Sequence, residues 1–404
     1  MEKRKKPRIR FKGFSDDWEQ RKLGACFEER CENMPDGELI SVTISDGIKK
    51  FSELGRHDNS NQDKSKYKKV CIGDIAYNSM RMWQGASGYS PFEGIVSPAY
   101  TVLKPNVNIN SKCVSYLFKR QDMIHVFQLN SQGITSDNWN LKFPALSQIA
   151  VSLPGDIKEQ SRIATYFSNI DTLITLHQRK LEKLKIIKKS MLEKCFPKKG
   201  EKVPKIRFSG FTDDWEQRKL GDVANSFEYG LNVAAKAYDG INKYIRITDI
   251  DDVSCKFLFN NLTSPNVNIS EAINYQLKKG DILFARTGAS VGKTYLYSEK
   301  DGMVFYAGFL IRAKISSSYD SNFIFQNTLT ESYRRYIQIT SQRSGQPGVN
   351  AQEYGEYKLM IPRLLEQKKI GNYFKYLDTL ITLHQSKLEK LQKIKKSMLE
   401  RMFV

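Results

Sequence analysis

The chain has 404 residues, 40% of them hydrophobic and 27% charged, which is typical of a globular protein large enough for two domains. Lys and Arg outnumber Asp and Glu by 64 to 44, and the resulting net charge of +20 favours a polyanionic partner such as nucleic acid. No run of about 18 apolar residues is present, which excludes a membrane-spanning helix. Because no apolar segment follows the basic N-terminus, we expect no secretory signal and a cytoplasmic protein.

Two stretches of the chain occur twice. Residues 7–24 return as residues 204–221 with 15 of 18 positions identical, and residues 163–196 return as residues 370–403 with 24 of 34 identical. The segments between these copies differ. A short repeat, a variable block and a long repeat therefore follow one another twice, and this duplication predicts a pseudo-two-fold molecule with matching scaffolds and two different heads.

The repeats divide the chain into six segments. In chain order we predict an N-terminal repeat segment at 1–24, a first head at 25–160, a central helical spacer at 161–200, a second copy of the repeat segment at 201–221, a second head at 222–367 and a C-terminal helical spacer at 368–404. Short β-rich runs separated by Gly and Asn indicate α/β (α+β) heads. Shared landmarks, such as Gly73-Asp74-Ile75 and Gly280-Asp281-Ile282, suggest one fold that carries two surfaces.

Each long repeat has apolar residues at alternating spacings of four and three, which predicts a helix with a coiled-coil seam. Helices that share a sequence most simply pair with each other, although each could instead pack on its own domain. The histidines in the seam are expected to set register and not to bind metal. The predicted seam residues are Ile170, Ile174, His177, Leu181, Leu184, Leu377, Ile381, His384, Leu388 and Leu391.

Each head contains two polar loops that could contact DNA bases. Arg can bind guanine through two hydrogen bonds, Asn and Gln can do the same for adenine, and Gly permits close backbone approach. Ordinary surface turns are the alternative. The candidates in the first head are Asn78, Ser79, Arg81, Trp83, Gln84, Ser87, Gln132, Thr135, Ser136 and Asn138, and in the second head Arg286, Thr287, Ser290, Lys293, Gln342, Arg343, Ser344, Gln346 and Asn350.

No motif in the sequence indicates catalysis by the chain itself. The stretch from Gly288 to Thr294 is similar to a phosphate-binding loop but is one residue too short and lacks the first glycine. The Pro-Pro pair of adenine methyltransferases is absent. Four scattered histidines and six cysteines have no metal-ligand spacing. We therefore expect no catalytic residue, metal or cofactor on this chain.

Several segments resemble a known family. They are Trp18–Gly24 and its copy from Trp215, the segments 154–160 and 362–367 that precede the long repeats, and GDILFARTGASVGKT at 280–294. Together with the order of the repeats, they resemble the specificity subunit of type I restriction-modification systems over essentially the whole chain.

The resemblance implies two target recognition domains, each recognising one half of a split site in double-stranded DNA, and an antiparallel helix pair that sets the spacing between the halves. Modification subunits would dock on the helices and methylate adenine with S-adenosylmethionine. Restriction subunits would add a motor and nuclease that use ATP and Mg. The alternatives are a fused DNA methyltransferase or nuclease, and a coiled-coil scaffold without base recognition.

Overall fold

The computed structural model describes residues 6–45, 47–135, 138–342 and 345–404, which form two compact units. The first unit combines Met1–Gln178 with Ser386–Val404, and the second is Arg179–Gln385. Both contain part of each of two 38-residue helices, α5 (Ile157–Lys194) and α11 (Leu364–Arg401). No helix within the described ranges is long and apolar enough to span a membrane.

The two long helices begin earlier than the predicted spacers at 161 and 368. Asp156 explains the start of α5, because its carboxylate accepts a hydrogen bond from the backbone N–H of Lys158 at 2.7 Å and so satisfies a free amide in the first turn. At the other end, α5 stops at Lys194, before the predicted limit of 200.

The predicted mixed α/β composition of the heads is confirmed. The first unit contains β1 (Glu19–Lys22), α1 (Leu23–Cys26), β2 (Phe27–Glu29), β3 (Ile40–Thr43), β4 (Gly47–Lys50), β5 (Lys68–Val70), β6 (Ile75–Asn78), β7 (Ser87–Tyr89), β8 (Gly94–Val96), β9 (Tyr100–Pro105), α2 (Ser111–Leu117), α3 (Gln121–Leu129), α4 (Phe143–Ser147) and β10 (Ala150–Leu153). The second contains β11 (Glu216–Lys219), α6 (Leu220–Val223), β12 (Ala224–Tyr229), β13 (Ala235–Ala237), β14 (Lys243–Ile245), β15 (Thr263–Pro265), α7 (Ile269–Ala272), β16 (Asp281–Ala285), β17 (Thr294–Leu296), β18 (Val304–Tyr306), β19 (Leu310–Ile315), α8 (Ser321–Asn327), α9 (Glu331–Thr340), α10 (Ala351–Gly355) and β20 (Lys358–Ile361).

Both heads contain a four-stranded antiparallel sheet with the same topology. The strand order is β2-β9-β6-β7 in the first head and β12-β19-β16-β17 in the second. The registers also correspond, since Ile75 lies opposite Leu103 and Ile282 opposite Ala313. The remaining strands differ: β5 and β8 pair antiparallel, whereas β14 and β18 pair parallel. The two heads therefore have central sheets of the same topology but different peripheral elements.

The short repeats attach each head to the start of a long helix. β1 pairs with β10 and β11 pairs with β20, both antiparallel. The Arg10 guanidinium donates two hydrogen bonds, of 2.7 and 2.8 Å, to the Glu159 carboxylate in the first turn of α5. Arg207 makes the same two bonds to Glu366 in α11. The duplicated sequence thus produces the same contact twice. We call the pairs Arg10–Glu159 and Arg207–Glu366 the joints between the short repeats and the long helices.

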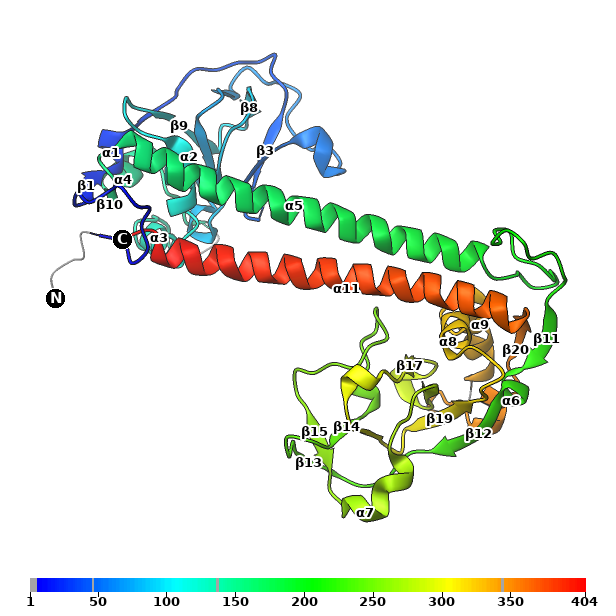
Figure 1. Ribbon diagram of the computed structural model, residues 1–404. Helices are drawn as coiled ribbons and strands as arrows, with labels where there is room; N and C mark the ends of the chain where they lie inside the picture. Colours follow the sequence, from blue (N-terminus) through cyan, green and yellow to red (C-terminus); the bar gives the residue numbers. More distant parts are fainter. Residues whose placement is uncertain (1–5, 46, 136–137, 343–344) are drawn as a thin grey trace. The chain divides into compact units, whose positions relative to one another are not determined.

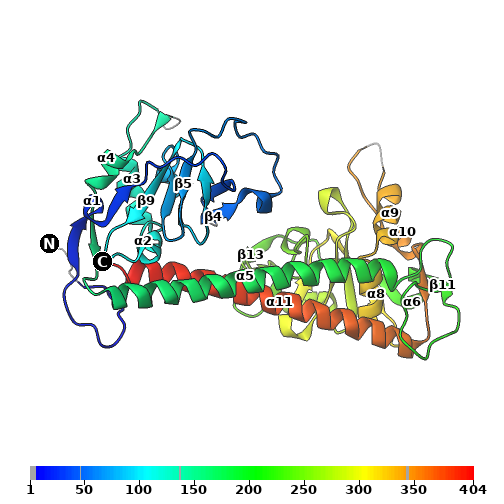
Figure 2. The same ribbon diagram turned by 90° about the horizontal axis from the view of Figure 1, so that it is seen from above.

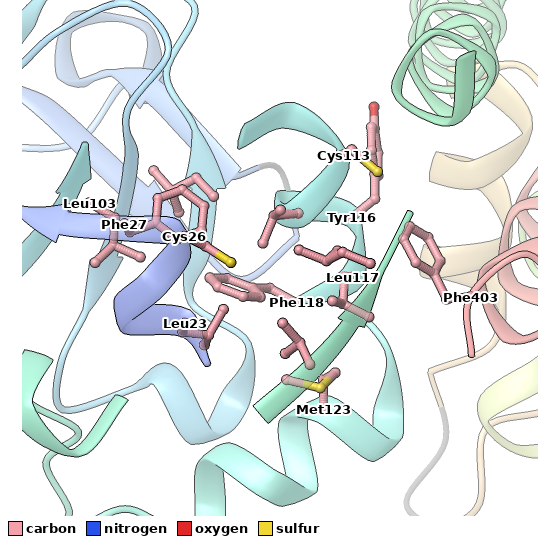
Figure 3. Packing of buried hydrophobic residues seen from close by; sticks show 14 of the residues in the cluster. Leu23, Cys26, Phe27, Leu103, Cys113, Tyr116, Leu117, Phe118, Met123 and Phe403 are labelled. Carbon is pink, nitrogen blue, oxygen red and sulfur yellow. The ribbon is translucent and has the colours of Figure 1, made fainter. Parts of the chain in front are cut away.

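In each unit an aromatic cluster packs together residues from both long repeats and from the short repeat. In the first unit the Phe403 ring stacks on Phe167, with centroids 6.0 Å apart, and packs edge-on against Trp18 at 6.1 Å. Figure 3 shows Phe403 beside the buried residues of this core, which include Leu117 and Phe118. The duplicated residues Phe196, Phe374 and Trp215 form the same cluster in the second unit.

The helices run antiparallel, as predicted. Within each unit an ion pair between them lies one turn or more from the aromatic contact, further along α5 where it is earlier along α11 in the first unit, and the reverse in the second. The Lys395 ammonium lies 2.6 Å from the Asp171 carboxylate in the first unit, and Lys188 lies 2.7 Å from Asp378 in the second. Within each unit the corresponding stretches of α5 and α11 lie side by side (Figures 1 and 2). The two pairs map onto each other at the repeat offset, which is what pseudo-two-fold symmetry requires.

The predicted seam faces inward along both helices. Ile170, Leu181, Leu377 and Leu388 are buried. The other predicted seam residues, Ile174, His177, Leu184, Ile381, His384 and Leu391, are half-buried. The helices also contact their own heads, because the Tyr116 hydroxyl donates to Asp171 at 2.8 Å. The two packing modes considered for the sequence therefore occur together.

Replacing Glu366 with Gln tests the joint between the short repeat and α11. The Glu366 side chain is 1% exposed, so the substitution leaves the Arg207 charge without its carboxylate. We expect a loss of roughly 2–3 kcal/mol of stability, seen as a melting temperature lower by about 5–10 °C. The exposed pair of Arg218 and Glu216 provides the control, since Glu216→Gln should shift the melting temperature by at most about 1 °C. Equal shifts in the two variants would contradict a structural role for the joint.

Candidate nucleic-acid interface

The structure brings the two candidate loops of each head together. In the first head the backbone N–H of Leu141, just after the second loop, donates to the Ser79 carbonyl at 2.9 Å, and the Trp83 and Trp139 rings meet with centroids 5.2 Å apart. In the second head the Val349 N–H donates to the Arg286 carbonyl at 2.9 Å. Loops separated by many residues in sequence therefore form one continuous surface in each head.

The first loop of each surface follows the equivalent strand of its own sheet. Ser79 follows β6 and its N–H donates to the Ala99 carbonyl at 3.4 Å, while Arg286 follows β16 and donates to the Phe309 carbonyl at 3.0 Å. The two positions are thus equivalent in backbone hydrogen bonding. Their side chains differ in size and charge, so one scaffold presents two different chemistries.

Buried tyrosines hold the glycine-rich turn of the second head. The Tyr333 hydroxyl donates to the Gly292 carbonyl at 3.1 Å, and the Gly292 N–H donates to the Tyr354 hydroxyl, also at 3.1 Å. Tyr354 in turn donates to the Ala285 carbonyl at 2.6 Å. Burial raises the pKa of Tyr333 and of Tyr354, so both hydroxyls keep their protons. The turn is a preorganised structural element.

The corresponding turn of the first head is held by different groups. The Lys119 ammonium donates to the Gly85 carbonyl at 2.8 Å and to the Ile44 carbonyl at 3.1 Å. The Trp83 indole N–H donates to the Met80 carbonyl at 3.1 Å, within the turn itself. The cation therefore fixes the loop and is not available as a free surface charge.

Buried ion pairs connect the strands beneath these surfaces. In the first head Arg30 contacts Asp74 at 2.7 Å, and in the second Arg312 contacts Glu228 and lies 3.7 Å from Asp281. Burial opposes ionisation of Glu228, but hydrogen bonds from Lys314 and Arg312 outweigh it and lower its pKa to about 2. The landmark aspartates are therefore structural residues that bind arginines from different strands in the two heads.

Most of the predicted contact residues are accessible on the described surface. Arg81, Gln84, Gln132, Thr135, Asn138, Gln342, Gln346 and Asn350 are exposed, and Asn78, Trp83, Arg286, Thr287, Ser290 and Lys293 are half-buried. Ser136, Arg343 and Ser344 lie outside the described residues. Several of the accessible side chains already have structural partners. Lys293 forms an ion pair with Asp252, Asn350 accepts a hydrogen bond from the Glu353 N–H at the start of α10, and the Asn78 side chain accepts one from the Met80 N–H.

Two of the predicted contact residues are buried and not accessible on the described surface. Ser79 is 5% exposed and its hydroxyl is hydrogen-bonded to that of Thr101 at 2.8 Å, while Ser87 is fully buried. Both residues face the core side of the sheet, a direction that polarity alone does not reveal. In this structure neither side chain is available for a contact with DNA.

Sequence reasoning also missed several residues of these surfaces. Trp139 pairs with Trp83 in the first head, and the Tyr229 and Phe309 rings flank Arg286 in the second. Tyr229 is the last residue of β12 and Phe309 lies in the turn just before β19, and no spacing in the sequence connects them with the loops. Within the described ranges, no cluster of three or more His, Cys, Asp or Glu side chains is placed to hold a metal ion.

Comparison with known proteins identifies the family. The sequence model of the type I restriction modification DNA specificity domain matches residues 15–186 and, a second time, residues 212–393. The chain belongs to this family and carries two copies of its domain. The resemblance inferred from the repeats is therefore confirmed.

Two relatives from Methanocaldococcus jannaschii are similar along most of their length. The type I restriction enzyme MjaVIII specificity subunit is 23% identical over 358 residues, covering 83% of this chain and 81% of the relative. The putative type I restriction enzyme MjaX specificity subunit is 23% identical over 374 residues, covering 88% and 84%. The crystal structure of the S subunit of a type I system from M. genitalium shares the fold, with a TM-score of 0.61, 15% identity and 99% of both chains covered.

Replacing Gly292 with Ala tests the preorganised turn of the second head. Gly292 has a φ of +83°, and an added Cβ would lie 2.6 Å from Ile337. Strain and overpacking together should cost about 2–4 kcal/mol, measured by thermal denaturation. Gly240 is the matched control: its φ is +92° but nothing lies within 4 Å of a Cβ, so Gly240→Ala should cost only about 1 kcal/mol. Equal costs would show that the turn can move away from Ile337 and is therefore not rigidly preorganised.

Proposed function

We propose that this chain is the DNA-recognition subunit of a type I restriction-modification complex, in which each head recognises one half of a bipartite site in double-stranded DNA. The observation that carries the proposal is the shared sheet with different loops at equivalent positions. The same scaffold would place two surfaces on DNA in the same manner, while different side chains would select different bases. The net charge of +20 supports binding to a polyanion.

The proposal also assigns a task to the paired helices. Modification subunits would dock on α5 and α11 and methylate adenine with S-adenosylmethionine, and restriction subunits would supply an ATP- and Mg-dependent motor and nuclease. The chain itself would contribute no catalytic residue and no cofactor, and would act in the cytoplasm. Because adenine is stacked within the duplex, methylation would require the base to be flipped out.

The proposal is tested by mapping N6-methyladenine across the genome of a methylation-free bacterial host that expresses the chain with its modification subunit. We expect one split motif, methylated in both halves and absent when the chain is omitted. A second strain carries a chain in which residues 25–160 come from another member of the family. In that strain only one half of the motif should change, because the two heads are separate structures on separate sheets.

Other outcomes would support the alternatives. Methylation by the purified chain alone would favour a fused methyltransferase. An assembled complex that produces no motif would favour a scaffold without base recognition. A head exchange that alters both halves of the motif would contradict independent recognition by the two heads.

A further inference from the structure

Arg286 of the second head lies close to two aromatic rings. Its guanidinium carbon is 5.1 Å from the centroid of the Tyr229 ring and 5.9 Å from that of the Phe309 ring. Both rings remain accessible, with Tyr229 44% and Phe309 55% exposed. Cation–π contacts with two rings restrict the orientation of the guanidinium plane. The side chain is therefore held in place at the base of the surface formed by the two loops.

The charge of Arg286 has no counterion in the parts of the chain that the structure describes. Its Nε atom is buried without a hydrogen-bond partner, and no hydrogen bond joins its terminal nitrogens to a described residue. The Nε atom of Arg312 in the same head is also unpaired, but the charge of Arg312 is neutralised by Glu228, and its terminal nitrogens donate to two backbone carbonyls. Leaving a half-buried charge unpaired is unfavourable, and an external acceptor would remove that cost.

The equivalent position of the first head lacks this feature. Ser79 has the same backbone hydrogen bonds as Arg286, but its side chain is buried and bonded to Thr101. Ala99 occupies the position that corresponds to Phe309. The cation and its aromatic neighbours thus occur together in the second head and not in the first, so this part of the surface differs between the two heads.

The geometry points to a guanine as the acceptor. We propose that Arg286 donates two parallel hydrogen bonds to N7 and O6 of one guanine in the half-site of the second head, and that Tyr229 and Phe309 position it. A guanidinium of fixed orientation matches the two acceptors that guanine presents in the major groove. Arginine can also bind a phosphate through two hydrogen bonds, and the base analogues and the salt dependence described below separate that contact from a guanine contact. This inference rests on the proposed function.

The first test requires no change to the protein. The full chain, assembled with its modification subunit, is given DNA duplexes that carry 7-deazaguanine at each guanine of the site in turn. Because this analogue lacks the N7 acceptor, we expect a single position in the half-site of the second head at which methylation falls by about 10-fold or more. Inosine, which retains N7 and O6, should be tolerated at that position.

The second test combines the analogue with protein variants. Arg286→Lys keeps the charge but loses the two-donor geometry, and it should lower methylation of the natural site by about 10- to 100-fold. The variant should then be insensitive to 7-deazaguanine at the same position. Phe309→Leu should produce a smaller loss in the same direction. Arg218→Lys, which alters a surface pair with Glu216, is the control and should behave as wild type.

Three results would overturn the assignment. Arg286→Lys could keep wild-type sensitivity to every analogue, which would show that another residue recognises guanine. Equal weakening on all DNA sequences, with a reduced dependence on salt, would identify a phosphate contact instead. Failure of the wild-type complex to select any split motif would reject the recognition function itself, and the guanine assignment with it.

Discussion

The structure depends on one constraint: each unit is completed by the far end of a helix that begins in the other half of the duplicated pattern. Phe403, near the C-terminus, packs against Phe167 and Trp18 in the first unit, and Phe196 occupies the same place in the second. Without this exchange each long helix would leave an apolar seam facing water. The antiparallel pairing, the two-fold relation of the ion pairs and the attachment of the heads all follow from it.

This scaffold separates stability from recognition. The residues that join head to helix, such as Arg207 and Glu366, are duplicated and largely buried, whereas the loops that differ between heads follow the ends of β6 and β16. A head can therefore change its surface without disturbing the joint. The ion pairs beneath the loops also differ between the heads. Asp74 pairs with Arg30, which follows β2, whereas the equivalent Asp281 lies near Arg312 of β19.

The sequence was sufficient to predict the features that follow from its duplication and from the periodicity of its apolar residues. It predicted the two heads, the helix pair, the inward-facing seam and the loops that meet on each surface. It could not indicate which polar side chains face the core, so Ser79 and Ser87 were assigned to the surface. Nor could it connect Arg286 with Tyr229 and Phe309, because strand pairing, and not spacing, brings them together. Contacts between strands that are distant in sequence become visible only in the folded structure.

The central claim is tested most directly by hydrogen exchange on the full chain carrying Phe403→Ala. Removing this ring leaves a cavity costing about 3–5 kcal/mol in the first unit. The structure predicts faster exchange in β1, β10 and α2 and unchanged exchange in the second unit, with Phe196→Ala producing the opposite pattern. Loss of protection confined to the last turns of α11, with the first head unaffected, would contradict the claim that the far helix end completes the unit.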